Sequence, residues 1–327
     1  MRRRALLLVS GAWAALGASG AFAQSGKSAR RIGWLYPGPG TRSVAAFAAF
    51  SAQMKALGYV EGRDIVYELR GTEGRDERLP VLARELVATH PAVIVTTTVP
   101  ATRALMQATR TLPIVFAAAG SPVEEGLVKS FARPGGNVTG VSVRLELMAK
   151  AGEYVREVLP GAKRMVVLAH ELYSYRPGVG FSWLAREVGP AGLEVRTVVI
   201  DKSNDIERAF AEIGVLRPDA ILVGPSPPFI THARRIVELA LDLGIPVFGV
   251  NRQHVAAGAL LAYYTDDAEN FRRAAALVDK ILKGKDPAEL PVDQPERFYL
   301  VINAQTAEVL DIAMPQSVLL RADGVIE

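Results

Sequence analysis

The 327-residue chain is long enough for two domains of ordinary size. It is 50% hydrophobic and 22% charged, a composition typical of folded globular proteins. Lysine and arginine total 38 against 34 acidic residues, and cysteine is absent. The lack of cysteine excludes disulfides, thiol catalysis, thiolate metal sites and the lipid-accepting cysteine of a lipoprotein.

The first 23 residues have the features of a secretory signal peptide. Three arginines at positions 2–4 precede a short apolar stretch, and Ala21-Phe22-Ala23 provides an A-x-A cleavage site before Gln24. The apolar stretch is too short, and too often interrupted by serine and glycine, to favour a membrane anchor. We therefore expect a soluble, exported, periplasmic protein. Of a twin-arginine signal, only the arginine cluster is present.

Cleavage at this site would remove three positive charges and no negative ones. The mature chain would then hold 35 basic residues, which is 38 minus 3, against 34 acidic residues. Binding to nucleic acid depends on an excess of lysine and arginine that can neutralise phosphates. A nearly neutral chain lacks that excess, so nucleic acid is not expected as a partner.

Short β-branched segments alternate with helical patterns from residue 31 onward, which predicts a mostly parallel sheet covered by helices. Between Pro91 and Ser142, two apolar runs end abruptly at small polar residues, as buried parallel strands do. The predicted strands of this first series cover residues 31–36, 65–69, 93–95 and 114–116, and the predicted helices include 41–57 and 79–87.

A Pro-Gly-Gly-Asn sequence at 134–137 interrupts the alternation, and residues 138–143 lead into a second, similar series. We interpret residues 138–143 as a hinge strand between two lobes. The alternative is a single Rossmann-like domain with an ordinary loop at this position. The second series has predicted strands at 165–169, 195–200, 220–223 and 245–250, and predicted helices at 145–159, 181–188, 206–213 and 231–243.

The last segments are too few to form a third domain. An extended run at 260–264, a helix at 268–282 and an extended run at 298–302 make sense if the chain returns to the first lobe and then crosses again. Further hinges are expected near 249–252 and 291–298. The predicted division is a signal peptide at 1–23, a first lobe of 24–139 plus 252–291, and a second lobe of 140–251 plus 292–327.

Motifs for catalysis or cofactor binding are incomplete. The nearest approach to G-x-S-x-G, Gly224-Pro225-Ser226-Pro227-Pro228, lacks the second glycine. The four histidines show no metal-ligand spacing, and there is no P-loop. The loop at 38–43 approaches a dinucleotide fingerprint, but Ser43 replaces its last glycine. We expect no catalytic residue, metal or cofactor. A secreted α/β hydrolase or nucleotide-dependent oxidoreductase is the competing class.

The loops at the predicted strand ends are rich in hydroxyls, amides and prolines. In an open α/β sheet, ligands bind at the carboxyl ends of the strands. Hydroxyls there orient a polar ligand, and backbone N–H groups after Pro100 could hold an anion. Each residue also fits an ordinary turn or cap, Asp266 in particular. The candidate ligand-binding residues are Tyr36, Gly38, Thr97, Thr98, Ser121, Pro122, Tyr175, Ser226, Asn251, Tyr264 and Asp266.

Several phrases resemble the ABC-transporter substrate-binding proteins of the tryptophan and tyrosine type. They include RIGWLYPG (31–38), ARPGGNVTGVS (132–142) and LPVDQPERFYLVIN (290–303), and the resemblance covers essentially the whole mature chain. It implies a type I periplasmic-binding fold of two Rossmann-like lobes with three crossovers. It also implies a receptor that closes on a small molecule and delivers it to an ABC permease in the inner membrane. We expect this receptor to be a monomer.

Two loops depart from the family pattern, so the ligand stays open between an amino acid and an aromatic or other carboxylate compound. Ser121 stands where many relatives have an acidic residue before Pro-Val, and residues 262–266 replace a common S-Y-G-P-D. A two-lobed sensor that presents its ligand to a membrane kinase is a further possibility that these residues do not separate from a transport receptor.

Overall fold

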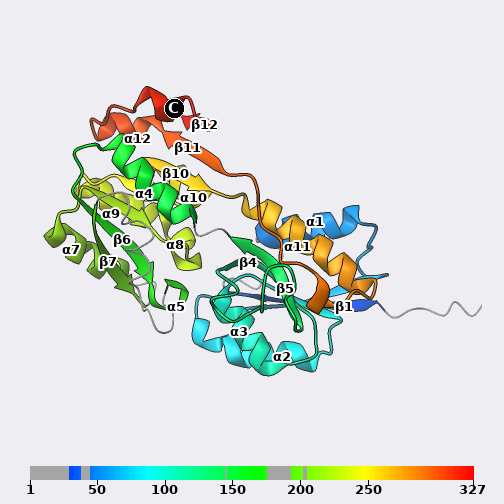
Figure 1. Ribbon diagram of the computed structural model, residues 1–327. Helices are drawn as coiled ribbons and strands as arrows, with labels where there is room; N and C mark the ends of the chain where they lie inside the picture. The colour runs from blue at the N-terminus through cyan, green and yellow to red at the C-terminus, as the bar shows by residue number, and fades with distance from the viewer. Residues whose placement is uncertain (1–28, 38–44, 144–145, 175–192, 202–204) are drawn as a thin grey trace, which may run out of the picture.

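The computed structural model describes residues 29–37, 45–143, 146–174, 193–201 and 205–327, and within them the chain forms two α/β lobes (Figure 1). The first lobe contains β1 (Arg30–Tyr36), α1 (Ala45–Ala56), β2 (Ile65–Gly71), the 3-10 turn η1 (Asp76–Arg78), α2 (Leu79–Ala88), β3 (Val93–Thr96), α3 (Val99–Ala108), β4 (Ile114–Gly120), β5 (Val138–Val143), α11 (Asp267–Leu282) and η4 (Pro287–Glu289).

The second lobe holds the remaining elements. They are α4 (Glu146–Val158), β6 (Arg164–His170), α5 (Glu171–Ser174), β7 (Glu194–Ile200), α7 (Ile206–Leu216), β8 (Ala220–Val223), α8 (Pro227–Thr231), α9 (Ala233–Asp242), β9 (Val247–Gly249), α10 (Arg252–Ala256), β10 (Leu261–Tyr264), β11 (Tyr299–Asn303), α12 (Ala304–Val309), α13 (Gln316–Leu319) and β12 (Gly324–Ile326). The helix expected at 181–188 falls outside the described residues.

Each lobe is built on one sheet. The first sheet has the order β2-β1-β3-β4-β5, and all its described pairings are parallel. The second has the order β12-β11-β10-β9-β8-β6-β7, in which only β10 and β11 pair antiparallel. Short loops that join parallel strands through helices produce this arrangement. The predicted fold class of two lobes with mostly parallel sheets is confirmed.

The chain crosses between the lobes three times: after β5, after β10, and between η4 and β11. These are the three crossovers of a type I periplasmic-binding fold. Two lobe boundaries lie later than expected. Residues 140–143 continue the pairing of β5 with β4 in the first sheet, whereas residues 261–264 pair with β9 and β11 in the second. The chain therefore returns to the first lobe at Thr265-Asp266, not at 249–252.

The core of the first lobe depends on a helix from the far end of the sequence. Figure 1 shows α11 beside α1 although more than 200 residues separate them. The ring centroid of Trp34 on β1 lies 5.5 Å from that of Phe271 on α11 and 5.4 Å from that of Phe50 on α1. These three side chains are almost completely buried. Burial of each contributes about 2–3 kcal/mol to folding, so α11 is an integral part of the first lobe.

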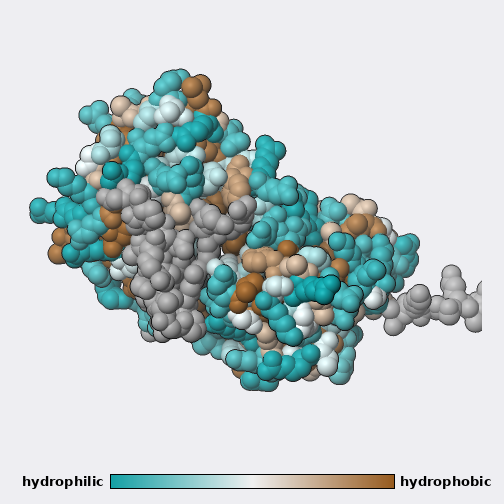
Figure 2. Space-filling model, viewed as in Figure 1, coloured by the Kyte–Doolittle hydropathy of each residue, from teal (hydrophilic) through white to brown (hydrophobic). Residues whose placement is uncertain are grey.

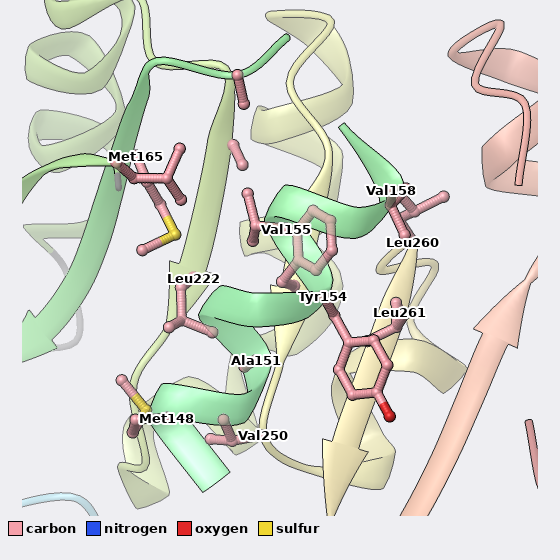
Figure 3. Packing of buried hydrophobic residues seen from close by; sticks show 14 of the residues in the cluster. Met148, Ala151, Tyr154, Val155, Val158, Met165, Leu222, Val250, Leu260 and Leu261 are labelled. Carbon is pink, nitrogen blue, oxygen red and sulfur yellow. The ribbon is translucent and has the colours of Figure 1, made fainter. Parts of the chain in front are cut away.

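The core of the second lobe forms where α4 crosses its sheet (Figure 3). Met148, Ala151 and Val155 lie three or four residues apart, so they share one face of the helix. This face packs against Met165 of β6 and Leu222 of β8. On the visible surface, hydrophilic residues predominate over both lobes and the hydrophobic ones form separate small patches (Figure 2). Among the described residues, no helix has the length and apolar character needed to cross a bilayer.

A glycine brings β5 unusually close to β4. A Cβ atom built on Gly140 would lie 2.1 Å from the backbone oxygen of Phe116, at the point where the pairing register of the two strands shifts. Such a contact is impossible without movement of the backbone, and a close-packed interior resists that movement. Gly140 is therefore required by packing.

We predict that Gly140→Ala lowers the free energy of unfolding by about 1–3 kcal/mol or more, because the strands must separate to admit the methyl group. Urea or thermal unfolding of the purified protein measures this. Gly136→Ala is the matched control, because no heavy atom lies within 4 Å of its built Cβ. Equal stability of the two variants would contradict the packing argument.

Candidate ligand-binding site

A cavity of about 390 Å³ lies between the two lobes, within the range of about 300–1,000 Å³ that is common for small-molecule sites. The cavity is lined by residues that follow the carboxyl ends of strands in both sheets. Open α/β sheets bind their ligands at these ends. They include Tyr36 after β1, Thr97 and Thr98 after β3, Ser226 after β8 and Asn251 after β9.

A second hollow of about 900 Å³ lies on the second lobe alone. It is more open, and Pro218, Asp219 and Ile245 among its lining residues precede β8 and β9. It therefore opens at the amino ends of these strands, away from the gap between the lobes. We place the ligand-binding site in the interlobe cavity.

The carboxylate of Asp267 lines this cavity at the junction of the lobes. Asp267 is the first residue of α11, and its Oδ2 accepts a hydrogen bond of 2.9 Å from Nδ2 of Asn251 in the second lobe. Burial raises the pKa of Asp267, the Asn251 hydrogen bond acts in the opposite direction, and the charge of Asp266 raises it further. The side chain is partly accessible because the cavity reaches it, although protein surrounds it on most sides.

Asn251 is held rigidly in this position. It caps the start of α10, where its Oδ1 accepts a hydrogen bond of 2.9 Å from the backbone N–H of Gln253. Its amide oxygen is thus used within its own lobe, and its amide NH₂ points to Asp267. The arrangement leaves the other oxygen of the Asp267 carboxylate available to a ligand that carries a positive charge.

Aromatic and aliphatic side chains form the walls of the cavity. Burial raises the pKa of Tyr36, and the neighbouring charge of Asp267 adds to that effect, so the phenol stays protonated. Phe271 lies behind it, in contact with the same Trp34 ring as Tyr36. Further apolar lining comes mainly from the second lobe: Val143, Leu147, Met148, Leu172, Ile230 and Val250.

Two hydroxyl groups line the cavity beside helix starts that contain proline. Thr97 and Ser226 are buried, and neither Oγ has a hydrogen-bond partner among the described residues. Thr97 precedes α3, which has a proline in its first turn, and Ser226 caps α8, which begins with Pro227. Because proline has no N–H, these helix starts offer fewer backbone donors than usual. The hydroxyls are therefore the free donors at this part of the wall.

A fixed cation lies on the first-lobe wall. Nη2 of Arg103 on α3 lies 2.6 Å from Oε2 of Glu125 and also donates to the backbone oxygen of Glu125 at 3.1 Å. The Glu125 side chain is 8% exposed and that of Arg103 is 39% exposed. Both line the cavity. The buried carboxylate orients the guanidinium, so an anionic ligand group would meet an arginine that is already in place.

His254 of α10 also borders the cavity, but it is completely surrounded by protein. Neither ring nitrogen has a hydrogen-bond partner among the described residues. Burial lowers the pKa of His254 to about 4, and the backbone of Phe229 acts in the opposite direction. The ring is therefore neutral near pH 7 and acts as part of the packed wall.

The candidate residues from the sequence are only partly brought together here. Tyr36, Thr97, Thr98, Ser226 and Asn251 line the cavity. Gly38 and Tyr175 lie outside the described residues. Four candidates do not line the cavity: Ser121, Pro122, Tyr264 and Asp266.

The local backbone explains these displacements. Ser121 has a φ of 46°, which starts a turn, so Gly120 lines the cavity instead. Asp266 is directed to the helix that it caps, since Oδ1 accepts from the N–H of Ala268 at 3.0 Å and Oδ2 lies 3.2 Å from Arg272. Tyr264 stacks on Tyr299 at 5.7 Å between ring centroids. Asp267, Arg103, Glu125 and Phe271 also line the cavity, and no local sequence pattern marks them as ligand-binding residues.

A family model described as ABC transporter substrate binding protein matches residues 43–326. The chain belongs to this family. The curated tyrosine-binding protein of Clostridioides difficile is 27% identical over 264 residues, which cover 80% of this substrate-binding protein and 75% of that one.

Solved structures agree with this assignment. The ABC domain from Streptococcus pneumonia in complex with L-Trp has a TM-score of 0.82 at 25% identity, and the match covers 91% of this chain and 100% of that chain. A conserved domain protein from Vibrio cholerae has the same TM-score and coverage at 29% identity. The resemblance found in the sequence is therefore confirmed.

We predict that His254 makes the folded protein less stable in mild acid. Its folded-state pKa of about 4 lies below the usual value of 6.5, so the unfolded chain binds the extra proton first. Stability should fall by about 3 kcal/mol between pH 6.5 and pH 4 from this residue alone. Urea unfolding at several pH values measures the loss.

His254→Leu removes the titrating group, so the variant should lose less stability than the parent over this interval. Above pH 7.5 the two free energies should change in parallel, whatever their absolute difference. An identical loss for parent and variant between pH 6.5 and pH 4 would show that His254 is not held neutral.

Proposed function

We propose that this substrate-binding protein is an exported, periplasmic, monomeric receptor that binds an amino acid with an aromatic side chain and delivers it to an ABC permease in the inner membrane. The observation that carries the proposal is an interlobe cavity lined by a largely buried carboxylate, by hydroxyl groups without a partner among the described residues and by aromatic side chains. These three parts match the ammonium, the carboxylate and the side chain of such a ligand.

The ammonium group would bind at Asp267. Burial disfavours the charged form of this carboxyl, and a cation at hydrogen-bond distance reverses that effect. Asn251 satisfies one carboxylate oxygen and so directs the other to the ligand. Binding would therefore relieve an electrostatic penalty that the protein carries without a cationic partner.

The ligand carboxylate would bind at Thr97, Ser226 and Arg103. The two hydroxyls donate hydrogen bonds that nothing else among the described residues accepts, and the guanidinium supplies the charge. The positive end of the ten-residue helix α3 adds to the potential at this position. An anion here would thus be held mainly by side chains.

The walls favour a large apolar side chain. Tyr36 and Phe271 from the first lobe and Leu147 and Met148 from the second are among the apolar and aromatic residues that line the cavity, and they could pack against a ring system. The relatives support this choice, because one is named a tyrosine-binding protein and another holds L-Trp. Family membership also supports a receptor over the secreted hydrolase or oxidoreductase.

Each lobe provides only part of these contacts, so a ligand would bind the closed arrangement better than an open one. A ligand with that preference shifts the population toward closure, and the closed form is what a permease would recognise. Ligand-dependent transport by membrane vesicles that contain the permease would separate this role from signalling to a membrane kinase.

We predict submillimolar binding of L-tryptophan, L-tyrosine or L-phenylalanine in isothermal titration calorimetry. Asp267→Asn should weaken this binding about 100-fold or more, because it removes the partner of a buried ammonium. Indole-3-propionate and 3-(4-hydroxyphenyl)propionate, which lack the amine, should bind parent and variant alike.

Asp266→Asn is the matched control. Asparagine caps helices as well as aspartate does, and Asp266 does not line the cavity, so the affinity should change less than about threefold. The proposal fails if none of the three amino acids binds. The role of Asp267 fails if its variant binds them as tightly as the parent does.

A further inference from the structure

A hydrogen bond joins the two lobes across the cleft. Oη of Tyr173 on α5 donates to Oδ2 of Asp76 in η1, a residue 97 positions away in the sequence. α5 follows β6 of the second sheet and η1 follows β2 of the first, so the bond links the loops at two facing strand ends. Tyr173 also lines the interlobe cavity, and α5 contacts α3 of the first lobe.

The acceptor is held in place by its own lobe. The other carboxylate oxygen of Asp76, Oδ1, accepts a hydrogen bond of 3.0 Å from the hydroxyl of Thr72, which is completely buried. The backbone oxygen of Asp76 accepts from the N–H of Leu79, at the start of α2. Asp76 therefore has a defined position whether or not Tyr173 is near.

The donor is held in the same way by the second lobe. The ring of Tyr173 lies 5.1 Å from that of His170, which lies 6.1 Å from the fully buried Phe229. Nδ1 of His170 accepts a hydrogen bond of 3.2 Å from the N–H of Leu172, which fixes the imidazole at the start of α5. Two groups fixed on separate lobes can meet only when the lobes approach each other.

We propose that Tyr173 and Asp76 form a clasp over the cleft that stabilises the closed state and slows release of the bound ligand. The proposal rests on the ligand-binding function proposed above. A contact made in only one of two states shifts the balance toward that state by the full free energy of the contact. Its acceptor is a carboxylate, so the bond belongs to the stronger, charge-assisted class.

The test uses Tyr173→Phe, which keeps the ring and removes only the hydroxyl. We expect dissociation of radiolabelled L-tyrosine, L-tryptophan or L-phenylalanine to become about 10- to 100-fold faster. Tyr59→Phe is the matched control. It breaks a tyrosine–aspartate bond of 2.9 Å to Asp279, but both residues belong to the first lobe, so the dissociation rate should stay unchanged.

A second measurement does not depend on ligand binding. Because the chain has no cysteine, Val81→Cys on α2 and Val215→Cys on α7 place one spin label on each lobe. Both positions are exposed, at 49% and 83%. In pulsed electron paramagnetic resonance, Tyr173→Phe should increase the share of long interlabel distances in the ligand-free protein, and Tyr59→Phe should not.

Asp76→Ala should reproduce both effects, and the double variant with Tyr173→Phe should add nothing further, since both changes remove the same bond. Unchanged distances in Tyr173→Phe, or fully additive effects in the double variant, would overturn the clasp. If the distances shift as expected while none of the three amino acids binds, the clasp stands and the proposed ligand class falls.

Discussion

The packing of α11 onto the first lobe is the constraint on which the binding cleft depends. This helix buries Phe271 against Trp34 and lies along α1, so its position is set by the hydrophobic core. Its first residue is Asp267. A helix that is fixed along its length also fixes its first turn, and the carboxylate is thereby held at the cavity opposite Asn251. The same contacts that stabilise the lobe position its charge.

Neither lobe has a complete site. The first contributes Asp267, Arg103 and the Thr97 hydroxyl, while the second contributes most of the apolar wall together with Ser226 and Asn251. Among the described residues, side-chain hydrogen bonds from Asn251 to Asp267 and from Tyr173 to Asp76 connect the lobes. The proposed function therefore joins recognition to lobe closure, because the residues proposed to contact the ligand come from both lobes.

The two-lobed fold follows from the sequence because the alternation of short apolar runs and helical periods is a local signal. Thr97 and Ser226 could be named because each lies within three residues of the end of such a run. The sequence does not show whether Asp266 or Asp267 lines the cavity, because this depends on which of the two adjacent residues caps α11. Arg103 and Phe271 face the cavity from helix interiors, and β12 exists through pairing with β11, so each depends on tertiary contacts that no local pattern reveals.

Prolines at the starts of α3 and α8 have a consequence for evolution. Where backbone amides hold an anion, every sequence with the same fold keeps the same donors. In the proposed site, Thr97 and Ser226 would supply donors as side chains, and Arg103 would supply the charge. Single codon changes can therefore remove or alter each one without disturbing a helix. If the proposed site binds an acid, mutation and selection can change its preference for one acid over another more readily than in a site built from backbone amides.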